Sequence, residues 1–220
     1  MIAYYKNSDF DSALNWTKKG IGTFVLDGDR IDHYYYLLLN KAIYLEKMKQ
    51  NEKALRAVKN LRNKIIQSQQ QNSNTHPIRH SVITQMYIVF GNVLNNLGLR
   101  EEGLEYTKEG IEIAQVNQSY DHLFTLWTTM GIIYYSLGNS EDAEVYYRLA
   151  LSIEQRVENN NYLSFAYTNL SSLLIKQNKF EQAEKYMKKS LKISQQSDNK
   201  LRQTESYSVM GQWYLEQGKY

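Results

Sequence analysis

The sequence contains no cysteine, only one proline and no long apolar run. The lack of cysteine excludes a disulfide framework, a thiolate metal ligand and a cysteine nucleophile. No stretch approaches the roughly 20 apolar residues of a membrane-spanning helix. The first residues, MIAYYKNSDF, lack the basic start and apolar core of a signal peptide. We therefore expect a cytoplasmic protein without a membrane partner, in which the scarcity of proline leaves long stretches free to form helix.

Charge gives little indication of a partner. Charged residues make up 22% of the chain, the net charge is +3, and no long block carries one sign. A nucleic-acid-binding domain usually concentrates its basic residues on one face, and a single-strand binder interleaves them with aromatic residues. We therefore predict no direct contact with nucleic acid.

The motifs of common enzyme and metal sites are missing as well. Gly20 and Gly22 form a single G-x-G after a helical segment, without the preceding strand that a nucleotide-binding loop requires. His76 and His80 lie on either side of Pro77, and no further ligands cluster nearby, which disfavours a zinc site. We predict no catalytic residue, no metal and no cofactor, so that the protein is not an enzyme.

The segment WTTMGIIYYSLGNSEDAEVYYRLA, residues 127–150, carries the clearest pattern in the chain. Seven of its residues stand at the fixed offsets of one known repeat: Trp127, Met130, Gly131, Tyr134, Ala143, Tyr147 and Ala150. The pattern resembles the tetratricopeptide repeat (TPR), in which W-x2-L-G-x2-Y marks the first helix and A-x3-F the second. Here Met replaces Leu and Tyr replaces Phe.

The pattern recurs along the chain. The small residue at position 131 returns at steps of 40 residues, as Gly91, Ser171 and Gly211. The small residue at position 143 returns in the other second helices as Ala13, Ala54, Gly103 and Ala183. The resemblance implies an all-α fold, a right-handed superhelical TPR solenoid of antiparallel helix pairs. We expect about five repeats, with incomplete repeats at the ends.

A single TPR array is expected over residues 1–220. Its approximate repeats are 1–30, 31–66, 81–118, 121–158, 161–198 and a partial repeat at 201–220. Residues 67–80 begin with QSQQQNSNTHP, which is polar and amide-rich and predicts a loop between repeats. In the second repeat Lys41 occupies a position that is usually Leu. Because the end repeats are incomplete, the chain is either a fragment of a longer protein or an array with atypical caps.

Stacked helix pairs form an extended concave surface that commonly binds ligands. In TPR proteins the first helices line this surface, at positions three before, one after and four after the small residue. The candidate peptide-binding residues at or beside such positions are mostly polar and uncharged: Asn92, Asn95, Asn96, Thr128, Tyr135, Thr168, Asn169, Ser172, Lys176 and Gln212. Side-chain amides donate and accept hydrogen bonds, so they can pair with the backbone of an extended peptide. The alternative is that each amide is merely solvated.

Three features resemble one group of TPR proteins more closely: the steps of 40 residues, the Tyr- and Asn-rich first helices, and YTNLSSLLIKQNKFEQAEKYMKKSLKIS. This group is the RNPP cell–cell signalling regulators of Gram-positive bacteria, of the Rap, NprR, PlcR and Rgg types. The resemblance implies a cytoplasmic quorum-sensing receptor, often a transcriptional regulator, whose groove binds a short re-imported peptide. It implies that Asn92 and Asn169 hold the peptide backbone, and it allows a homodimer. Many members carry a helix-turn-helix domain, which this sequence does not contain.

Two functions therefore stay open. The chain is either the ligand-sensing domain of a peptide-responsive regulator or a constitutive adaptor that binds other proteins. An adaptor that clamps carboxylates would need several basic residues at the inner positions, where we find only Lys176 and Lys41. The sequence therefore disfavours that kind of adaptor.

Overall fold

All regular structure in the computed structural model is helical within the residues that the structure describes, 9–24, 31–70, 78–196 and 199–218. This confirms the all-α fold. The chain divides into two compact units, Met1–Asn117 and Gln118–Tyr220. Within the described ranges, no helix combines the length and the apolar composition needed to cross a bilayer.

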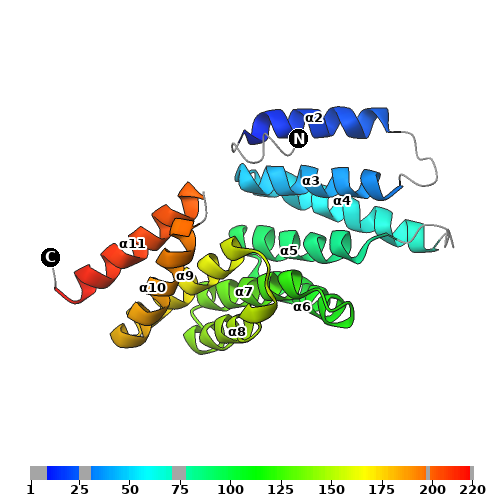
Figure 1. Ribbon diagram of the computed structural model, residues 1–220. Helices are drawn as coiled ribbons and strands as arrows, with labels where there is room; N and C mark the ends of the chain where they lie inside the picture. The colour runs from blue at the N-terminus through cyan, green and yellow to red at the C-terminus, as the bar shows by residue number, and fades with distance from the viewer. Residues whose placement is uncertain (1–8, 25–30, 71–77, 197–198, 219–220) are drawn as a thin grey trace. The chain divides into compact units, whose positions relative to one another are not determined.

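The first unit is built from alternating first and second helices of successive pairs. Its described helices are α2 (Phe10–Thr23), α3 (Ile31–Lys47), α4 (Asn51–Gln70), α5 (His80–Asn96) and α6 (Arg100–Val116). Helix α3 packs against α2, α4 and α5, and α5 packs against α4 and α6 (Figure 1). The first helices are therefore α3 and α5, and the second helices are α2, α4 and α6.

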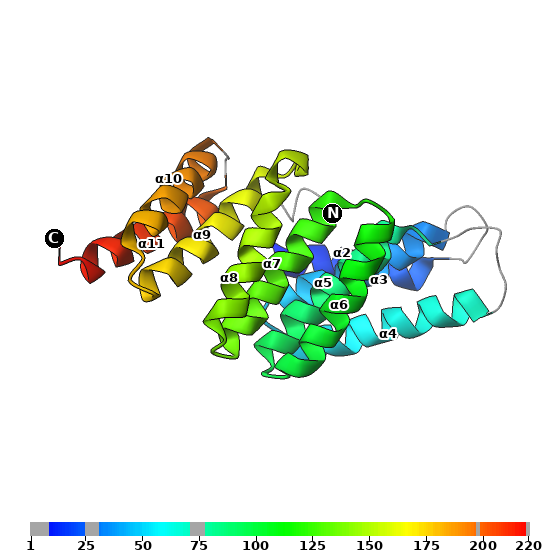
Figure 2. The same cartoon turned by 90° about the horizontal axis from the view of Figure 1, so that it is seen from below.

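The second unit continues the same alternation. Its described elements are α7 (Tyr120–Ser136), α8 (Ser140–Ser152), the 3-10 turn η2 (Glu154–Arg156), α9 (Asn160–Lys176), α10 (Phe180–Gln196) and α11 (Lys200–Glu216). Helix α9 packs against α7, α8, α10 and α11 (Figure 2). Asn139, Asn159 and Asn199 cap α8, α9 and α11 by accepting a hydrogen bond from a backbone N–H of the first turn. The first helices of this unit are α7, α9 and α11.

A left-handed residue follows the first helix of each pair. These residues, with their φ angles, are Lys49 (59°), Gly98 (80°), Gly138 (80°), Asn178 (58°) and Gly218 (63°). After α5 the amide of Leu99 donates to the carbonyl oxygen of Leu94 at 2.9 Å, which is the bond that closes this kind of helix end. The four later residues are spaced by 40 positions, so the turn chemistry follows the repeat.

Small residues set how closely the helices of a pair approach. A Cβ atom at Gly131 in α7 would lie 2.5 Å from Cε1 of Tyr147 in α8, so glycine is required for this contact. The second helices have a fully buried small residue at the Ala143 position of the repeat: Ala54 in α4, Ala143 in α8 and Ala183 in α10. Small residues thus permit the close helix crossings of the repeat.

The tyrosine at the Trp position of α5 makes a polar contact with the second helix. Tyr87 is 7% exposed, and its hydroxyl donates to Oε2 of Glu109 in α6 at 2.7 Å. Burial and the bond to Glu109 raise the pKa of Tyr87 to about 12. Arg62 of α4 lies 3.8 Å from the same carboxylate. The Trp position of this repeat therefore takes part in a polar network as well as in the core.

Part of the segment expected as a loop, residues 67–80, is helical. Helix α4 continues to Gln70, so residues 67–70 are helical, and α5 begins at His80. Glutamine is a good helix former, so a polar composition does not by itself end a helix. Residues 71–77, with His76 and Pro77, lie outside the described residues, as do residues 1–8.

Candidate functional site

A groove of about 400 Å³ lies between α9 and α11. Its lining is polar, with one ring and one aliphatic side chain: Phe165, Thr168, Asn169, Ser172, Thr204, Glu205, Ser208 and Val209. The four residues from α9 have the spacing i, i+3, i+4, i+7, which places them on one face of the helix. Those from α11 have the spacing i, i+1, i+4, i+5 and also share one face. We call this the hydroxyl groove.

A hydroxyl cluster beneath the groove fixes the three helices that form it. Ser190 of α10 is 1% exposed, and its Oγ lies 2.7 Å from Oγ1 of Thr168 in α9 and 2.9 Å from Oγ of Ser206 in α11. Ser190 also donates to the carbonyl oxygen of Ser164 at 3.0 Å. Buried polar groups that satisfy one another hold a unique arrangement of elements. The groove is therefore preformed.

The amide of Asn169 is the buried lining group that lacks a partner among the described residues. Its Nδ2 is buried and has no hydrogen-bond acceptor among the described residues. A buried donor without an acceptor costs about 1–3 kcal/mol. If the Asn169 side chain turns towards the groove, the carbonyl group of a ligand removes that cost.

The charge of the groove is balanced from within. Glu205 pairs with Arg202, one turn earlier in α11, at 2.5 Å. The guanidinium of Arg202 also lies 4.3 Å from the ring centroid of Phe165. The hydroxyl groove is therefore close to neutral and offers hydrogen bonds and apolar contact.

Three of the residues predicted from the sequence meet in this groove, namely Thr168, Asn169 and Ser172. Thr168 is 9% exposed, and its hydroxyl donates to the carbonyl oxygen of Ser164 at 2.9 Å, so it forms the base of the groove. Thr128 of α7 is more deeply buried, at 3%, and donates to the carbonyl oxygen of Phe124 at 2.8 Å. Its side chain lies within the helix packing.

Two other candidates contact each other. Nζ of Lys176 in α9 lies 4.7 Å from the ring centroid of Tyr135 in α7. Neither of these residues lines the hydroxyl groove, and the half-buried Gln212 of α11 does not line it either.

The three asparagines of α5 belong to the first compact unit. Asn92 and Asn95 are half-buried and Asn96 is exposed. Oδ1 of Asn95 is buried and has no donor within the described residues. The ten candidates are thus divided between the two units, and the structure gathers only three of them in the hydroxyl groove.

Of the other five lining residues, Ser208 stands three residues before Gly211, at an inner position. The sequence analysis missed the remaining four: Phe165, Thr204, Glu205 and Val209. Phe165 lies two turns before Ser172, and Thr204 lies one turn before Ser208. Extending the inner positions by one or two helical turns towards the N-terminus would have included both. Of the described residues, no group of three or more His, Asp or Glu is placed to hold a metal ion.

Comparison with known proteins agrees with this architecture. The tetratricopeptide repeat family model matches residues 123–196 and 162–220. Comparison with curated protein sequences gives no match.

Several solved structures share the fold of nearly the whole chain. The Rap conjugation gene regulator of plasmid pLS20, in complex with the Phr* peptide, has a TM-score of 0.82 at 13% identity over 99% of this chain and 57% of its own. The apo quorum sensor NprR from B. thuringiensis has a TM-score of 0.68 at 14% identity, over 99% and 57%. BtubC (BKLC) from P. vanneervenii has a TM-score of 0.69 at 17% identity, over 96% and 83%. The chain thus spans little more than half the length of the two regulators, and at these identities the likeness shows the fold.

Proposed function

We propose that the hydroxyl groove binds a short polypeptide segment in an extended conformation. The observation that carries this proposal is the buried, unpartnered Nδ2 of Asn169 in a preformed groove. An extended peptide presents backbone carbonyl groups that can accept from such an amide.

The remaining lining residues suit the same ligand. Thr204 and Ser208 are exposed on α11 and can donate to or accept from the peptide backbone. Phe165 and Val209 provide apolar contact for a peptide side chain. Because the groove is nearly neutral, we expect recognition through hydrogen bonds and shape, with little dependence on salt.

We further propose that the ligand is a short signalling peptide and that the chain is the sensing part of a cytoplasmic, RNPP-type regulator. The Rap conjugation gene regulator, which has the same fold, was solved with the Phr* peptide, and NprR is described as a quorum sensor. The amide-rich first helices of this chain agree with that proposal.

Calorimetric titration tests the proposal. Candidate ligands are synthetic peptides taken from short open reading frames in the DNA that flanks the gene. For a peptide that binds, we expect Asn169→Ala to weaken binding by about 1–3 kcal/mol, because a peptide carbonyl group loses its donor. Asn63→Ala, at an exposed position of α4, serves as the matched control and should leave affinity unchanged.

Equal affinity of the parent chain and Asn169→Ala would contradict the placement of the peptide in this groove. If none of the peptides binds, and a protein instead copurifies with the chain whatever the peptide present, the sensor proposal is replaced by a constitutive adaptor.

A further inference from the structure

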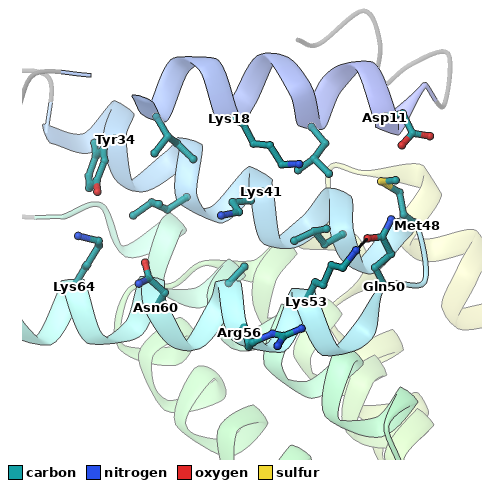
Figure 3. A pocket seen from close by; sticks show the side chains of 15 residues that line it. Asp11, Lys18, Tyr34, Lys41, Met48, Gln50, Lys53, Arg56, Asn60 and Lys64 are labelled. Carbon is teal, nitrogen blue, oxygen red and sulfur yellow. Dashed lines mark hydrogen bonds between the residues drawn. The ribbon is translucent and has the colours of Figure 1, made fainter. Parts of the chain in front are cut away.

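A second groove, of about 630 Å³, lies between the second helices α2 and α4, and α3 forms its floor. Five basic residues line it, together with a single carboxylate, Asp11: Lys18, Lys41, Lys53, Arg56 and Lys64. Figure 3 shows Lys18 extending from α2, Lys41 on α3, and Lys53 and Lys64 rising from α4. These cations are distributed over 47 residues of sequence, which is why no block of charge is visible in the chain. We call this the basic groove.

The cations of the basic groove have no acidic partner in the described part of the chain. Lys53 donates to Oε1 of Gln50 at 2.9 Å, and Nζ of Lys64 lies 5.6 Å from the ring centroid of Tyr34. Both contacts are to neutral groups. Like charges that share a concave surface produce a strong local potential that favours an anionic ligand.

Other neighbouring second helices pair their charges. Between α4 and α6, Lys59 lies 3.6 Å from Glu102 and Arg62 lies 3.8 Å from Glu109. A surplus of unpaired cations is therefore not a general property of the second helices.

The same holds between α8 and α10. Glu144 of α8 contacts Arg148 at 2.8 Å and Lys179, which precedes α10, at 2.9 Å. Arg148 also donates a hydrogen bond to Oε1 of Gln182 in α10 at 3.0 Å. The bridge here joins the two second helices, whereas α2 and α4 have no equivalent.

The groove is hollow because two side chains differ from those of the next pair. Helix α3 begins at residue 31 and α5 at residue 80, and α4 begins at 51 and α6 at 100, so equivalent positions are 49 residues apart. The positions of Phe90 and Tyr106, whose rings stack at 4.2 Å, are occupied in the earlier pair by Lys41 and Ala57. An aromatic pair is thus replaced by a cation and a methyl group.

The floor under these cations is aliphatic. Leu14, Leu38 and Leu45 line the groove and are 4–6% exposed. The groove therefore has a cationic rim and an apolar hollow, which lies where the next pair has an aromatic ring. A ligand that fills it needs negative charge beside an apolar group.

We propose that the basic groove binds an acidic segment of a protein partner, which inserts one aromatic or aliphatic side chain over Ala57 while its carboxylates pair with the lysines. Carboxylates would form the charge-assisted hydrogen bonds that these cations lack. This site lies within residues 9–70, and the hydroxyl groove lies within residues 160–216, so each proposal can fail without the other.

A polynucleotide is the competing anion. Stacking of bases needs free aromatic faces, and Tyr34 is the aromatic residue in the lining of this groove. Its ring already lies 5.4 Å from that of Phe24 and beneath Lys64. The aliphatic floor therefore favours a polypeptide.

Fluorescence anisotropy with a defined probe tests the proposal. The probe is a fluorescein-labelled peptide with glutamates on both sides of one tyrosine. Matched peptides replace every glutamate by glutamine, or the tyrosine by glycine, and a labelled single-stranded oligonucleotide represents the competing class. We expect the parent chain to bind the acidic peptide most tightly, and to lose affinity as salt is raised.

Two kinds of variant address charge and shape separately. Lys53→Glu with Arg56→Glu reverses the charge at one wall and should weaken binding at least about tenfold. Ala57→Tyr fills the hollow and should weaken binding by a similar factor without any loss of thermal stability. The matched control combines Lys108→Glu with Lys185→Glu, both exposed on other second helices, and should bind like the parent chain.

Several results would overturn the proposal: no binding of the acidic peptide, equal binding of the glutamine peptide, or parent-like binding by both groove variants. Tighter binding of the oligonucleotide than of the acidic peptide would show that the proposed class of ligand, an acidic polypeptide, is wrong. If Asn169→Ala alone abolished binding of the acidic peptide, the ligand would lie in the hydroxyl groove and not here.

Discussion

The pair α3/α4 and the pair α5/α6 place different side chains at the same positions. In α5/α6 the rings of Phe90 and Tyr106 stack at 4.2 Å and fill the space between the two helices. In α3/α4 the same positions hold Lys41, which is half-buried, and Ala57. Both pairs nevertheless keep small buried residues at their crossings, Ala42 and Ala54 in one and Gly91 and Gly103 in the other. The crossing is set by the small residues, so the neighbouring positions can change from filled to hollow.

The charges of the two second helices differ in the same way. Glu102 of α6 pairs with a lysine of the preceding second helix, whereas the equivalent residue of α4 is Lys53, which lines the basic groove. Glu105 of α6 corresponds to Arg56 of α4. The backbone of the repeat is therefore shared, and its side chains decide whether the surface is closed by internal ion pairs or left open to an anionic ligand.

The largest effect is expected from making α5/α6 resemble α3/α4. Tyr106→Ala should lower the free energy of unfolding by about 3 kcal/mol, because the ring that stacks on Phe90 is lost. Urea unfolding followed by circular dichroism measures this change. Tyr106→Phe, which keeps the stack, is the control. A loss below about 1 kcal/mol would show that the stack does not stabilise the pair α5/α6. The difference between the two pairs would then have no effect on stability.

The opposite change should have a smaller effect of opposite sign. Ala57→Tyr should raise the free energy of unfolding by about 1 kcal/mol, because a ring fills the hollow over Leu38 and Leu45. Adding Lys41→Met should increase the gain by more than the sum of the single changes, since the two side chains would contact each other. Destabilisation by Ala57→Tyr would mean that the hollow cannot accept a ring.

A pH-dependent effect concerns the Trp position of α5, which Tyr87 occupies and which is Leu38 in α3. The pKa of Tyr87 is about 12 in the folded chain against an ordinary value of 10. Between about pH 10 and 12 the unfolded chain loses this proton while the folded chain keeps it, so the free energy of unfolding falls as pH rises. Below pH 10 the group adds no pH dependence.

Tyr87→Phe should therefore reduce the loss of stability between about pH 10 and 12, as measured by urea unfolding across this range. Tyr36→Phe, at a ring that is 55% exposed, is the control and should follow the parent chain. An alkaline loss of the same size in Tyr87→Phe and the parent chain would show that Tyr87 does not cause it.

The sequence predicted the fold well because the repeat is a local, periodic signal. The spacing of Gly131, Ala143 and Tyr147 predicted a closely packed helix pair, and in the structure a Cβ atom added at Gly131 in α7 would lie 2.5 Å from Cε1 of Tyr147 in α8. The candidate site was predicted less well. Only Thr168, Asn169 and Ser172 meet in the hydroxyl groove, because the lining also depends on which face α11 presents to α9.

The basic groove illustrates what the pattern alone does not contain. The sequence shows that Lys41 stands where Leu is usual. Whether Lys41 lies beside a hollow depends on Ala57, which is 16 residues later and in the next helix. Lys18 enters the same groove from a third helix. Periodicity assigns each residue to a face of its own helix, and it does not state which faces meet.

The sequence by itself determined the helices, the period of 40 residues from α5 onwards and the close crossings, because small side chains at fixed offsets are sufficient to specify them. The tertiary structure decided where the molecule is filled and where it is hollow. It also decided which cations find a carboxylate and which do not. These properties depend on distances between side chains of different helices, and such distances are defined only once the helices have packed.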